Sequence, residues 1–368
     1  MANDSISDRV TRLFEALPDT IDVVALSPSE TLRYFTGLNM HKSERPTLVF
    51  LFLEGTPAVV HPVLEGDRIA GALPDAERYT YGDATDPVAA ASEAFEELTD
   101  NRRLHEPIGA EFRSTRLLEE EVFAPHDKEV VDVEDTVATV RSRKDETEIE
   151  RIRTAVEIIE GILEEVFDRI EPGMSEIDVE TEIEKRVIES EADAYAGGIV
   201  TSGKRTAYAH AKTGPHVIED EEFVMIDAGV IYEGYYSDIT RTVSVGEPKP
   251  ELVKIYDVVQ EAAAAARGRV EPGVEFQEID RAARTVIKDA GYGDYFPHRV
   301  GHGLGLEGHE PPYLVEGNDG TLEAGHAVTV EPGVYVPNIG GVRIEDDIVV
   351  TEDGSEVLST SSRELRIL

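Results

Sequence analysis

One segment of the sequence reads Phe296-Pro297-His298-Arg299-Val300-Gly301-His302-Gly303-Leu304-Gly305-Leu306-Glu307-Gly308-His309-Glu310-Pro311-Pro312. It holds three of the ten histidines of the chain, together with four glycines. That much glycine argues against a helix and predicts a loop whose backbone approaches another group closely. Histidine is the commonest metal ligand and exchanges protons near neutral pH. His298, His302 and His309 are therefore candidate site residues, against the alternative of a solvated, histidine-rich loop.

The glycines of this segment also have the spacing of a dinucleotide-binding fingerprint, at Gly303, Gly305 and Gly308. That motif follows a strand and opens a helix. Here the residues that follow end in Pro311 and Pro312, which make a poor helix start. We do not predict nucleotide binding.

Four carboxylates lie in or beside apolar runs of the sequence, which is where an ionised side chain is least expected. An ionised carboxylate is heavily penalised on burial unless it is paired, hydrogen-bonded or bound to a metal. Each run has the character of a strand, and if the strands lie side by side the four carboxylates can converge. The residues are Asp227 in 223–230, Asp238 in 237–243, Glu331 in 327–336 and Glu345 in 342–350.

Four converging carboxylates repel one another, and one arginine cannot neutralise them. Two divalent cations can, at one charge per carboxylate, and one imidazole would complete the shell. The alternative is four separate ion-paired residues at strand ends. An oxygen-rich shell with a single imidazole favours Mn or Co, with Zn and Fe as further candidates.

The chain of 368 residues has a formal net charge of −41, from 76 Asp and Glu against 35 Lys and Arg. These acidic residues are dispersed and do not form one tail, which suggests a surface adapted to high salt, where charge repulsion is screened. The same charge argues against binding of nucleic acid. There is no cysteine, and we find neither a signal peptide nor an apolar run of about 18 residues, so we expect a cytoplasmic protein with no membrane association.

The chain is long enough for two domains, which we place at 1–138 and 139–368 because the segment 136–144 looks like the crossover between them. The first is a smaller mixed α/β domain without a cluster of ligands. In the second, helices are expected over 145–170, 175–190, 250–269 and 276–290. The triplet Glu-Pro-Gly separates the helices of each pair, at 171–173 and again at 271–273. This repeat suggests an internal duplication.

Five dispersed motifs carry a resemblance to a known family. They are 226–229 (Ile-Asp-Ala-Gly), 237–242 (Ser-Asp-Ile-Thr-Arg-Thr), the 298–312 segment, 330–333 (Val-Glu-Pro-Gly) and 342–346 (Val-Arg-Ile-Glu-Asp). With these motifs the sequence resembles the creatinase/aminopeptidase P/prolidase family. The resemblance is strong over 145–368, and the segment Leu32-Arg33-Tyr34-Phe35-Thr36-Gly37 resembles the signature of the smaller N-terminal domain of that family.

The resemblance implies an α+β protein, with a C-terminal catalytic domain of the pita-bread fold and a creatinase-like N-terminal domain. It implies that two divalent metal ions are bound by five residues, of which Asp238 and Glu345 bridge the pair: Asp227, Asp238, His302, Glu331 and Glu345. It also implies active-site histidines at His210, His298 and His309. Residue 209 is often Pro in relatives and is Ala209 here. Creatinase itself lacks the metal set, which is complete in this chain.

The function implied is that of a dinuclear Xaa-Pro peptidase, either a dipeptidase or an aminopeptidase. A water activated by the two metals would attack the bond before proline, and Glu331 would move the proton. His309 and His210 would donate hydrogen bonds to the oxyanion or substrate, and His298 would support the pocket wall or the leaving group. Arg343 would hold Glu345 or bind a substrate carboxylate.

Two alternatives stay open from the sequence. The first is a metallohydrolase or lyase of the same fold that acts on a small non-peptide substrate. The second is a non-catalytic binding module, which the complete ligand set disfavours. The resemblance further implies a homodimer.

Overall fold

The computed structural model describes residues 2–84, 86–102, 104 and 107–368. They form two compact units, Met1–Arg141 and Ser142–Leu368. The boundary predicted from the sequence, after residue 138, lies in the same helix as this division, α6 (Glu134–Ser142). Within the described residues, no helix has both the length and the apolar character needed to cross a membrane.

The first unit is a mixed α/β layer structure around one six-stranded sheet with the strand order β4-β3-β2-β1-β5-β6. Strands β2 (Leu48–Phe52) and β3 (Ala58–Pro62) pair antiparallel, with Leu48 opposite Val60. Phe50, Phe95 and Phe123 pack against one another in the core. In chain order the helices and strands are α1 (Ala2–Ala16), β1 (Val23–Leu26), α2 (Glu30–Thr36), β2 (Leu48–Phe52), β3 (Ala58–Pro62), α3 (Gly66–Ala72), β4 (Glu77–Tyr81), α4 (Pro87–Arg102), β5 (Ile108–Ala110), α5 (Leu117–Phe123) and β6 (Val130–Asp132).

The second unit holds four long helices and three sheets in its described residues. The sheets have the strand orders β10-β8-β7, with β9 beside β8, then β12-β11-β13-β16-β17, and finally β14-β15. In chain order the elements are α7 (Glu146–Phe167), α8 (Glu176–Glu189), β7 (Ala194–Ser202), the 3-10 helix η3 (Gly203–Ala207), β8 (Glu222–Tyr232), β9 (Tyr235–Tyr236), β10 (Ile239–Val245), α9 (Pro250–Arg267), α10 (Phe276–Asp289), β11 (Gly301–Gly303), β12 (Glu310–Leu314), β13 (Ala327–Val330), β14 (Gly333–Val336), β15 (Gly340–Arg343), β16 (Asp346–Val350) and β17 (Ser355–Val357).

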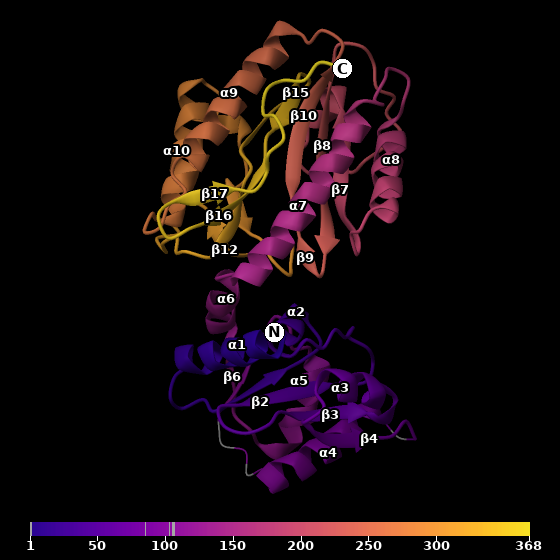
Figure 1. The fold of residues 1–368 in the computed structure, drawn as a ribbon, viewed down its shortest axis with the longest axis vertical. Coiled ribbons are helices and arrows are strands. Elements are labelled where there is room, and N and C mark those ends of the chain that lie inside the picture. Colours follow the sequence, from indigo (N-terminus) through magenta and orange to yellow (C-terminus); the bar gives the residue numbers. More distant parts are fainter. Residues whose placement is uncertain (1, 85, 103, 105–106) are drawn as a thin grey trace. The chain divides into compact units, whose positions relative to one another are not determined.

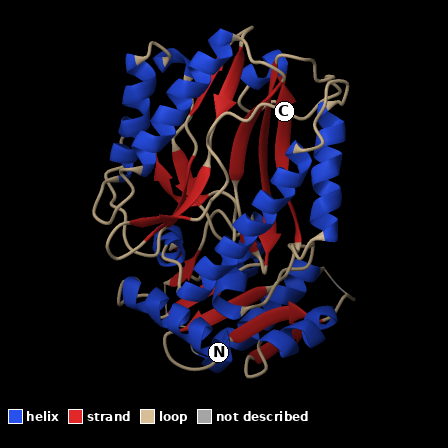
Figure 2. Ribbon diagram, turned by 45° about the horizontal axis from the view of Figure 1, so that its top comes forward, coloured by secondary structure: helices blue, strands red, loops and turns tan. Residues whose placement is uncertain are grey.

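The helices of this unit cover the sheets in two pairs. Figure 1 shows α7 and α8 beside β7 and β8, while α9 and α10 lie with the later strands of the chain. The strands therefore form the interior of the unit, with helices on the outside (Figure 2). One core cluster packs the apolar face of α9 and α10 against β12, β13 and β16, and includes Val259, Ile279, Leu314, Val328 and Ile348.

The suspected duplication is visible in the turns between the paired helices. Gly173 and Gly273 both have a positive φ, and each donates its backbone N–H to a carbonyl further along the chain, that of Ile218 and that of Leu322. Ser175 and Glu275 then pair with extended segments that precede β8 and β13. The two halves of the unit thus repeat one arrangement of helix, turn, helix and strands.

Two expectations from the sequence need correction. Glu331 and Glu345 do not lie inside continuous strands, because the chain leaves the larger sheet after Val330 and re-enters it at Asp346, forming the separate hairpin β14-β15 in between. The glycine-rich segment is not a loop throughout, since part of it forms β11 and β12. The expected close approach is present, however: a Cβ at Gly301 would collide with the carbonyl oxygen of Thr329.

Candidate metal centre

The five residues expected to bind metal come from separate elements of the second unit. Asp227 lies in the middle of β8, where it pairs with Thr240 of β10, and Asp238 immediately precedes β10. His302 is the central residue of β11. Glu331 and Glu345 occupy the two breaks between the sheets. Because both residues lie outside a regular strand, their side chains need not alternate between the two faces of a sheet. Both can therefore turn toward β8 and β11.

All five residues line one cavity of about 650 Å³. His210, His298, His309, Arg299 and Arg343 line the same cavity. The structure thus brings together every candidate site residue that the sequence singled out.

Among the described residues, the possible ligand atoms fall into three groups, and within each group all of them lie within 4.8 Å of one another. The groups are Asp227 with Asp238 and Glu345, His302 with Glu331 and Glu345, and Asp238 with His302 and His309. Asp238, Glu345 and His302 each belong to two of these groups, so the groups lie next to one another.

The charge of this cluster is poorly balanced by the protein alone. Burial raises the pKa of Asp238 and of Glu345 well above the ordinary values, and their mutual repulsion with Asp227 and Glu331 adds to it. Burial likewise raises the pKa of Glu331 to about 7, although Arg343 opposes the shift. A cation between these carboxylates would remove both the repulsion and the penalty of burial.

The imidazole of His302 is oriented as a neutral ligand. Its Nδ1 lies 3.0 Å from the carbonyl oxygen of Gly303, so Nδ1 carries the proton and Nε2 carries the lone pair. Nε2 lies 3.5 Å from Glu331 and 3.8 Å from Asp238, too far for hydrogen bonds but suited to a shared cation. Burial lowers the pKa of His302 to about 3, so the ring is neutral. The donor set therefore fits divalent metal ions.

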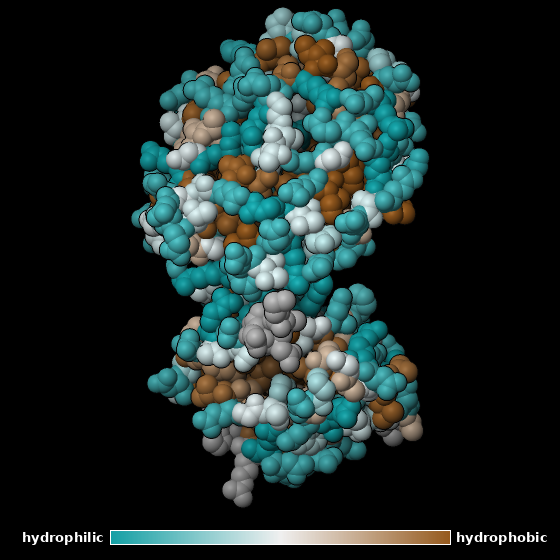
Figure 3. Space-filling view, viewed as in Figure 1, coloured by the Kyte–Doolittle hydropathy of each residue, from teal (hydrophilic) through white to brown (hydrophobic). Residues whose placement is uncertain are grey.

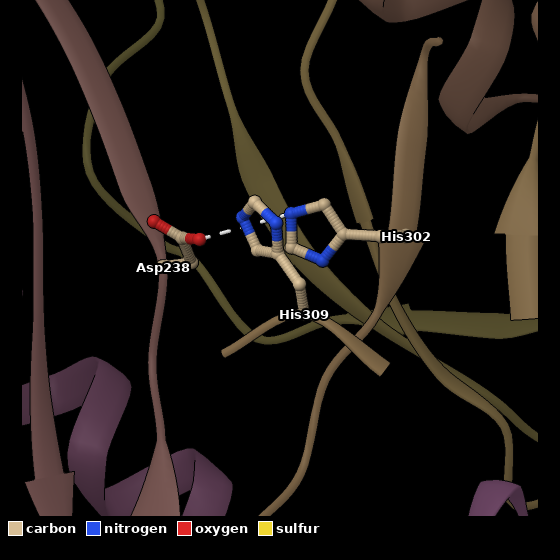
Figure 4. A group of neighbouring side chains, drawn as sticks. All are labelled: Asp238, His302 and His309. Atoms are coloured by element: carbon tan, nitrogen blue, oxygen red, sulfur yellow. Dashed lines mark ion pairs between the residues drawn. The ribbon is translucent and has the colours of Figure 1, made fainter. Parts of the chain in front are cut away.

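His309 stands next to His302. The two ring centroids are 3.9 Å apart, and Figure 4 shows both imidazoles near the carboxylate of Asp238. His309 and His210 are exposed to the cavity, whereas His298 is partly buried. The Nδ1 of His298 lies 2.8 Å from the carbonyl oxygen of Arg299 and its Nε2 lies 2.9 Å from the hydroxyl of Tyr335. His298 is thus held in place on both sides, and burial lowers its pKa to about 4.

A chain of hydrogen bonds that the sequence did not reveal orients the carboxylates. Arg343 donates through Nη2 to Asp227, through Nη1 to the Tyr335 hydroxyl at 2.9 Å and through Nε to the Thr240 hydroxyl at 3.0 Å. The Thr240 hydroxyl in turn donates to Glu345 at 2.6 Å. Arg343 therefore holds Asp227 directly and Glu345 through Thr240.

Asp347 was also missed, although it follows two other acidic residues. It is 1% exposed, and its Oδ2 accepts a hydrogen bond from the backbone N–H of Asp238 at 3.0 Å. The bond fixes the backbone of Asp238 against β16. The only signal in the sequence was the apolar run that surrounds Asp347, and the same run surrounds Glu345.

Comparison with known proteins identifies the family of this chain. Residues 150–352 match metallopeptidase family M24. A curated Xaa-Pro dipeptidase from Lactobacillus delbrueckii subsp. lactis is 33% identical over 356 residues, which cover 95% of each chain. The chain belongs to metallopeptidase family M24.

Solved structures of M24 relatives extend over nearly the whole chain. An Xaa-Pro dipeptidase from Bacillus anthracis has a TM-score of 0.89 and 33% identity, covering 99% of this chain and 100% of the other. An X-Pro aminopeptidase from Thermotoga maritima has a TM-score of 0.84 and 30% identity, covering 95% and 98%. These matches confirm the expected family and the α+β pita-bread fold class. They support a metallopeptidase, and both kinds of Xaa-Pro peptidase are among the relatives.

Proposed function

We propose that this metallopeptidase hydrolyses the peptide bond before proline in Xaa-Pro substrates. In this proposal Asp227, Asp238, His302, Glu331 and Glu345 would hold two divalent ions. The observation that supports it best is that the ligand atoms of these five residues fall into overlapping groups, within each of which all atoms lie within 4.8 Å of one another.

The bound ions would supply a Lewis acid for the scissile carbonyl and would lower the pKa of the attacking water. The residues of the chain supply the rest. Glu331, a carboxylate that faces the shared space, accepts a proton from the attacking water and returns it to the proline nitrogen. A tertiary amide needs this proton in order to leave as a neutral amine.

The three histidines have different roles in this proposal. His309 and His210 are exposed to the cavity, so each can donate a hydrogen bond to the oxyanion or to the substrate backbone. His298 is neutral and bonded on both sides, which suits a fixed wall of the pocket beside the leaving group. Arg343 keeps Asp227 and the Thr240 hydroxyl in place.

The test is removal of one carboxylate ligand and of the imidazole ligand. We expect Asp238→Ala and His302→Ala to lose bound metal, measured by elemental analysis, and to lose more than about a thousandfold in kcat/KM for Xaa-Pro dipeptides, tripeptides or both. His216→Ala, which changes a histidine outside the cavity, should keep both. Unchanged activity of either ligand variant, or activity confined to non-peptide amides in the same substrate panel, would refute the proposal.

Other parts of the expectation stay predictions. We propose Mn or Co as the metal on the basis of the oxygen-rich ligand set, with Zn or Fe as alternatives. A homodimer, a cytoplasmic location and adaptation to high salt follow from the family resemblance or the composition. The activity of the protein after reconstitution with each metal tests the identity of the metal. Light scattering of the purified protein tests the oligomeric state.

A further inference from the structure

Two of the buried carboxylates of the second unit do not line the cavity, and each of them pairs with an arginine. Glu176 of α8 is completely buried and accepts a hydrogen bond from Nε of Arg205 at 3.0 Å. Asp280 of α10 is completely buried and accepts hydrogen bonds from Nε and Nη2 of Arg284 at 2.7 and 2.9 Å. We refer to Glu176 with Arg205 as the first pair and to Asp280 with Arg284 as the second pair. A buried ion pair adds little stability by itself, so the other contacts of these pairs indicate their role.

The second pair holds the segment that carries His298. Arg284 donates through Nη1 to the carbonyl oxygen of Phe296 at 3.0 Å and through Nη2 to that of His298 at 2.9 Å. The backbone N–H of Val300 donates to Oδ1 of Asp280 at 3.1 Å. The guanidinium carbon of Arg284 also lies 4.3 Å from the centre of the Phe296 ring. The second pair therefore fixes the backbone of His298 and of the residues on both sides of it.

The first pair holds the segment between β7 and β8 that carries His210. The backbone N–H of Ser202, at the end of β7, donates to Oε1 of Glu176 at 2.7 Å. The backbone N–H of Gly214 donates to Oε2 of the same carboxylate at 2.9 Å. A Cβ at Gly214 would lie 2.9 Å from Nη2 of Arg205, so the backbone packs closely against the pair. One carboxylate thus fastens the chain both before and after His210.

The two halves of the unit place these carboxylates at different positions of their equivalent helices. Helices α8 and α10 both have 14 residues and follow the equivalent turns. The first residue of α8 is Glu176, and that of α10 is Phe276. In the same alignment Asp280 corresponds to Glu180. The internal repeat therefore does not by itself account for the two pairs. What the pairs share is their attachment to a segment that carries a histidine of the cavity.

We propose that these four residues are positioning residues of the active site, the second pair for His298 and the first pair for His210. Catalytic geometry must hold to fractions of an ångström, and a helix is more rigid than the irregular segments that carry both histidines. A carboxylate that accepts backbone N–H bonds and binds an arginine connects such a segment to the helix by strong, charge-assisted hydrogen bonds. The inference rests on the proposed function, because that function places both histidines beside the substrate.

The test is a double-mutant cycle on the full-length, metal-loaded protein, with Ala-Pro and Ala-Pro-Ala as substrates. We expect Asp280→Asn to keep its metal and to lose about 10- to 100-fold in kcat/KM, because His298 is displaced. In a His298→Ala protein the same change should cost less than about twofold, since the residue that it positions is gone. In a His210→Ala protein it should keep its full effect. Arg284→Lys keeps the charge beside Asp280 but cannot bond both carbonyl oxygens, so it should behave as Asp280→Asn does.

Glu176→Gln should give the converse result, with its effect abolished in His210→Ala and retained in His298→Ala. The matched control is Glu119→Gln, because Glu119 is also completely buried and pairs with Arg116, but in the first unit. This control should leave kcat/KM unchanged. A general loss of stability would act equally in every background, so the cycle separates positioning from stability.

Two kinetic outcomes overturn the inference: a full effect of Asp280→Asn or Arg284→Lys in the His298→Ala protein, or equal coupling of each pair to both histidines. A second readout does not depend on activity. In side-chain NMR spectra of the Zn²⁺-loaded protein, Asp280→Asn and Arg284→Lys should move the ring signals of His298, identified by their loss in His298→Ala, and leave those of His210 in place. Unmoved His298 signals contradict the inference. If the native protein cleaves neither peptide, the proposed function has failed, and the ring signals alone decide the inference.

Discussion

Thr240 shows how a single hydroxyl connects the charged residues of the site. It is fully buried, accepts a hydrogen bond from Arg343 and donates one to Glu345. Since the donated proton points at one oxygen of Glu345, the other oxygen is left for a cation. The residue thus orients a carboxylate although it does not itself line the cavity.

We predict that Thr240→Val weakens the binding of Mn²⁺ by about 10- to 100-fold, because Glu345 loses the bond that orients it. Titration against a chelator measures the affinity directly. Thr240→Ser, which keeps the hydroxyl, should bind Mn²⁺ almost as the native protein does. Thr285→Val on the exposed face of α10 is the control, and native-like affinity in Thr240→Val would contradict the prediction.

At the scale of elements, the strand β16 is anchored by its first residue. Asp346 is completely buried and pairs with Arg241 of β10 at 2.9 Å, Arg267 of α9 at 2.8 Å and Arg363 near the C-terminus at 2.8 Å. Burial raises the pKa of Asp346, but the three arginines outweigh it and hold the pKa below the ordinary value of 3.8. One carboxylate therefore ties three segments to the strand that follows Glu345.

We predict that Asp346→Asn lowers the free energy of unfolding by about 3 kcal/mol at pH 7, because the arginines lose their buried partner. The folded pKa is depressed, so the charge of Asp346 stabilises the native state above pH 3.8 and this contribution disappears as the pH falls through the folded value. The difference between variant and native protein in urea should therefore shrink below about pH 4. Asp353→Asn, at an exposed position, is the control. Equal stability of Asp346→Asn and the native protein at pH 7 would contradict the prediction.

At the scale of the whole molecule, the main feature is a large excess of negative charge. The formal net charge is −41, and the face drawn in Figure 3 is largely hydrophilic in both units. Repulsion among these carboxylates opposes compact structure at low ionic strength. At about 1 M salt the screening length falls to about 3 Å, which removes most of the repulsion.

We predict that the midpoint of thermal unfolding rises by about 5–10 °C between 0.1 and 2 M NaCl at pH 7, as followed by circular dichroism. The sequence pI is near 4.5, so the same series at pH 5 should show a much smaller rise because less charge remains to be screened. A midpoint that does not respond to salt at pH 7 would show that the surface charge has little effect on stability.

Much of the fold and several residues of the candidate site can be predicted from the sequence alone. The helix periodicity places α7 to α10, and the carboxylates in apolar runs single out Asp227, Asp238, Glu331 and Glu345, because burial penalises a charge that has no partner. The repeated Glu-Pro-Gly turns likewise indicate the two similar halves of the second unit. These features depend on residues close together in the chain, so they can be read from it.

Other features were decided only by the tertiary structure. Glu331 and Glu345 sit at breaks between two sheets, which no local pattern distinguishes from one continuous strand. Thr240 and Asp347 acquire their roles from partners more than 100 residues away in the chain. Tyr335 contacts His298, 37 residues before it, and Arg343, across the hairpin β14-β15. A polar side chain that is buried requires a partner, but only the tertiary structure determines which residue that partner is.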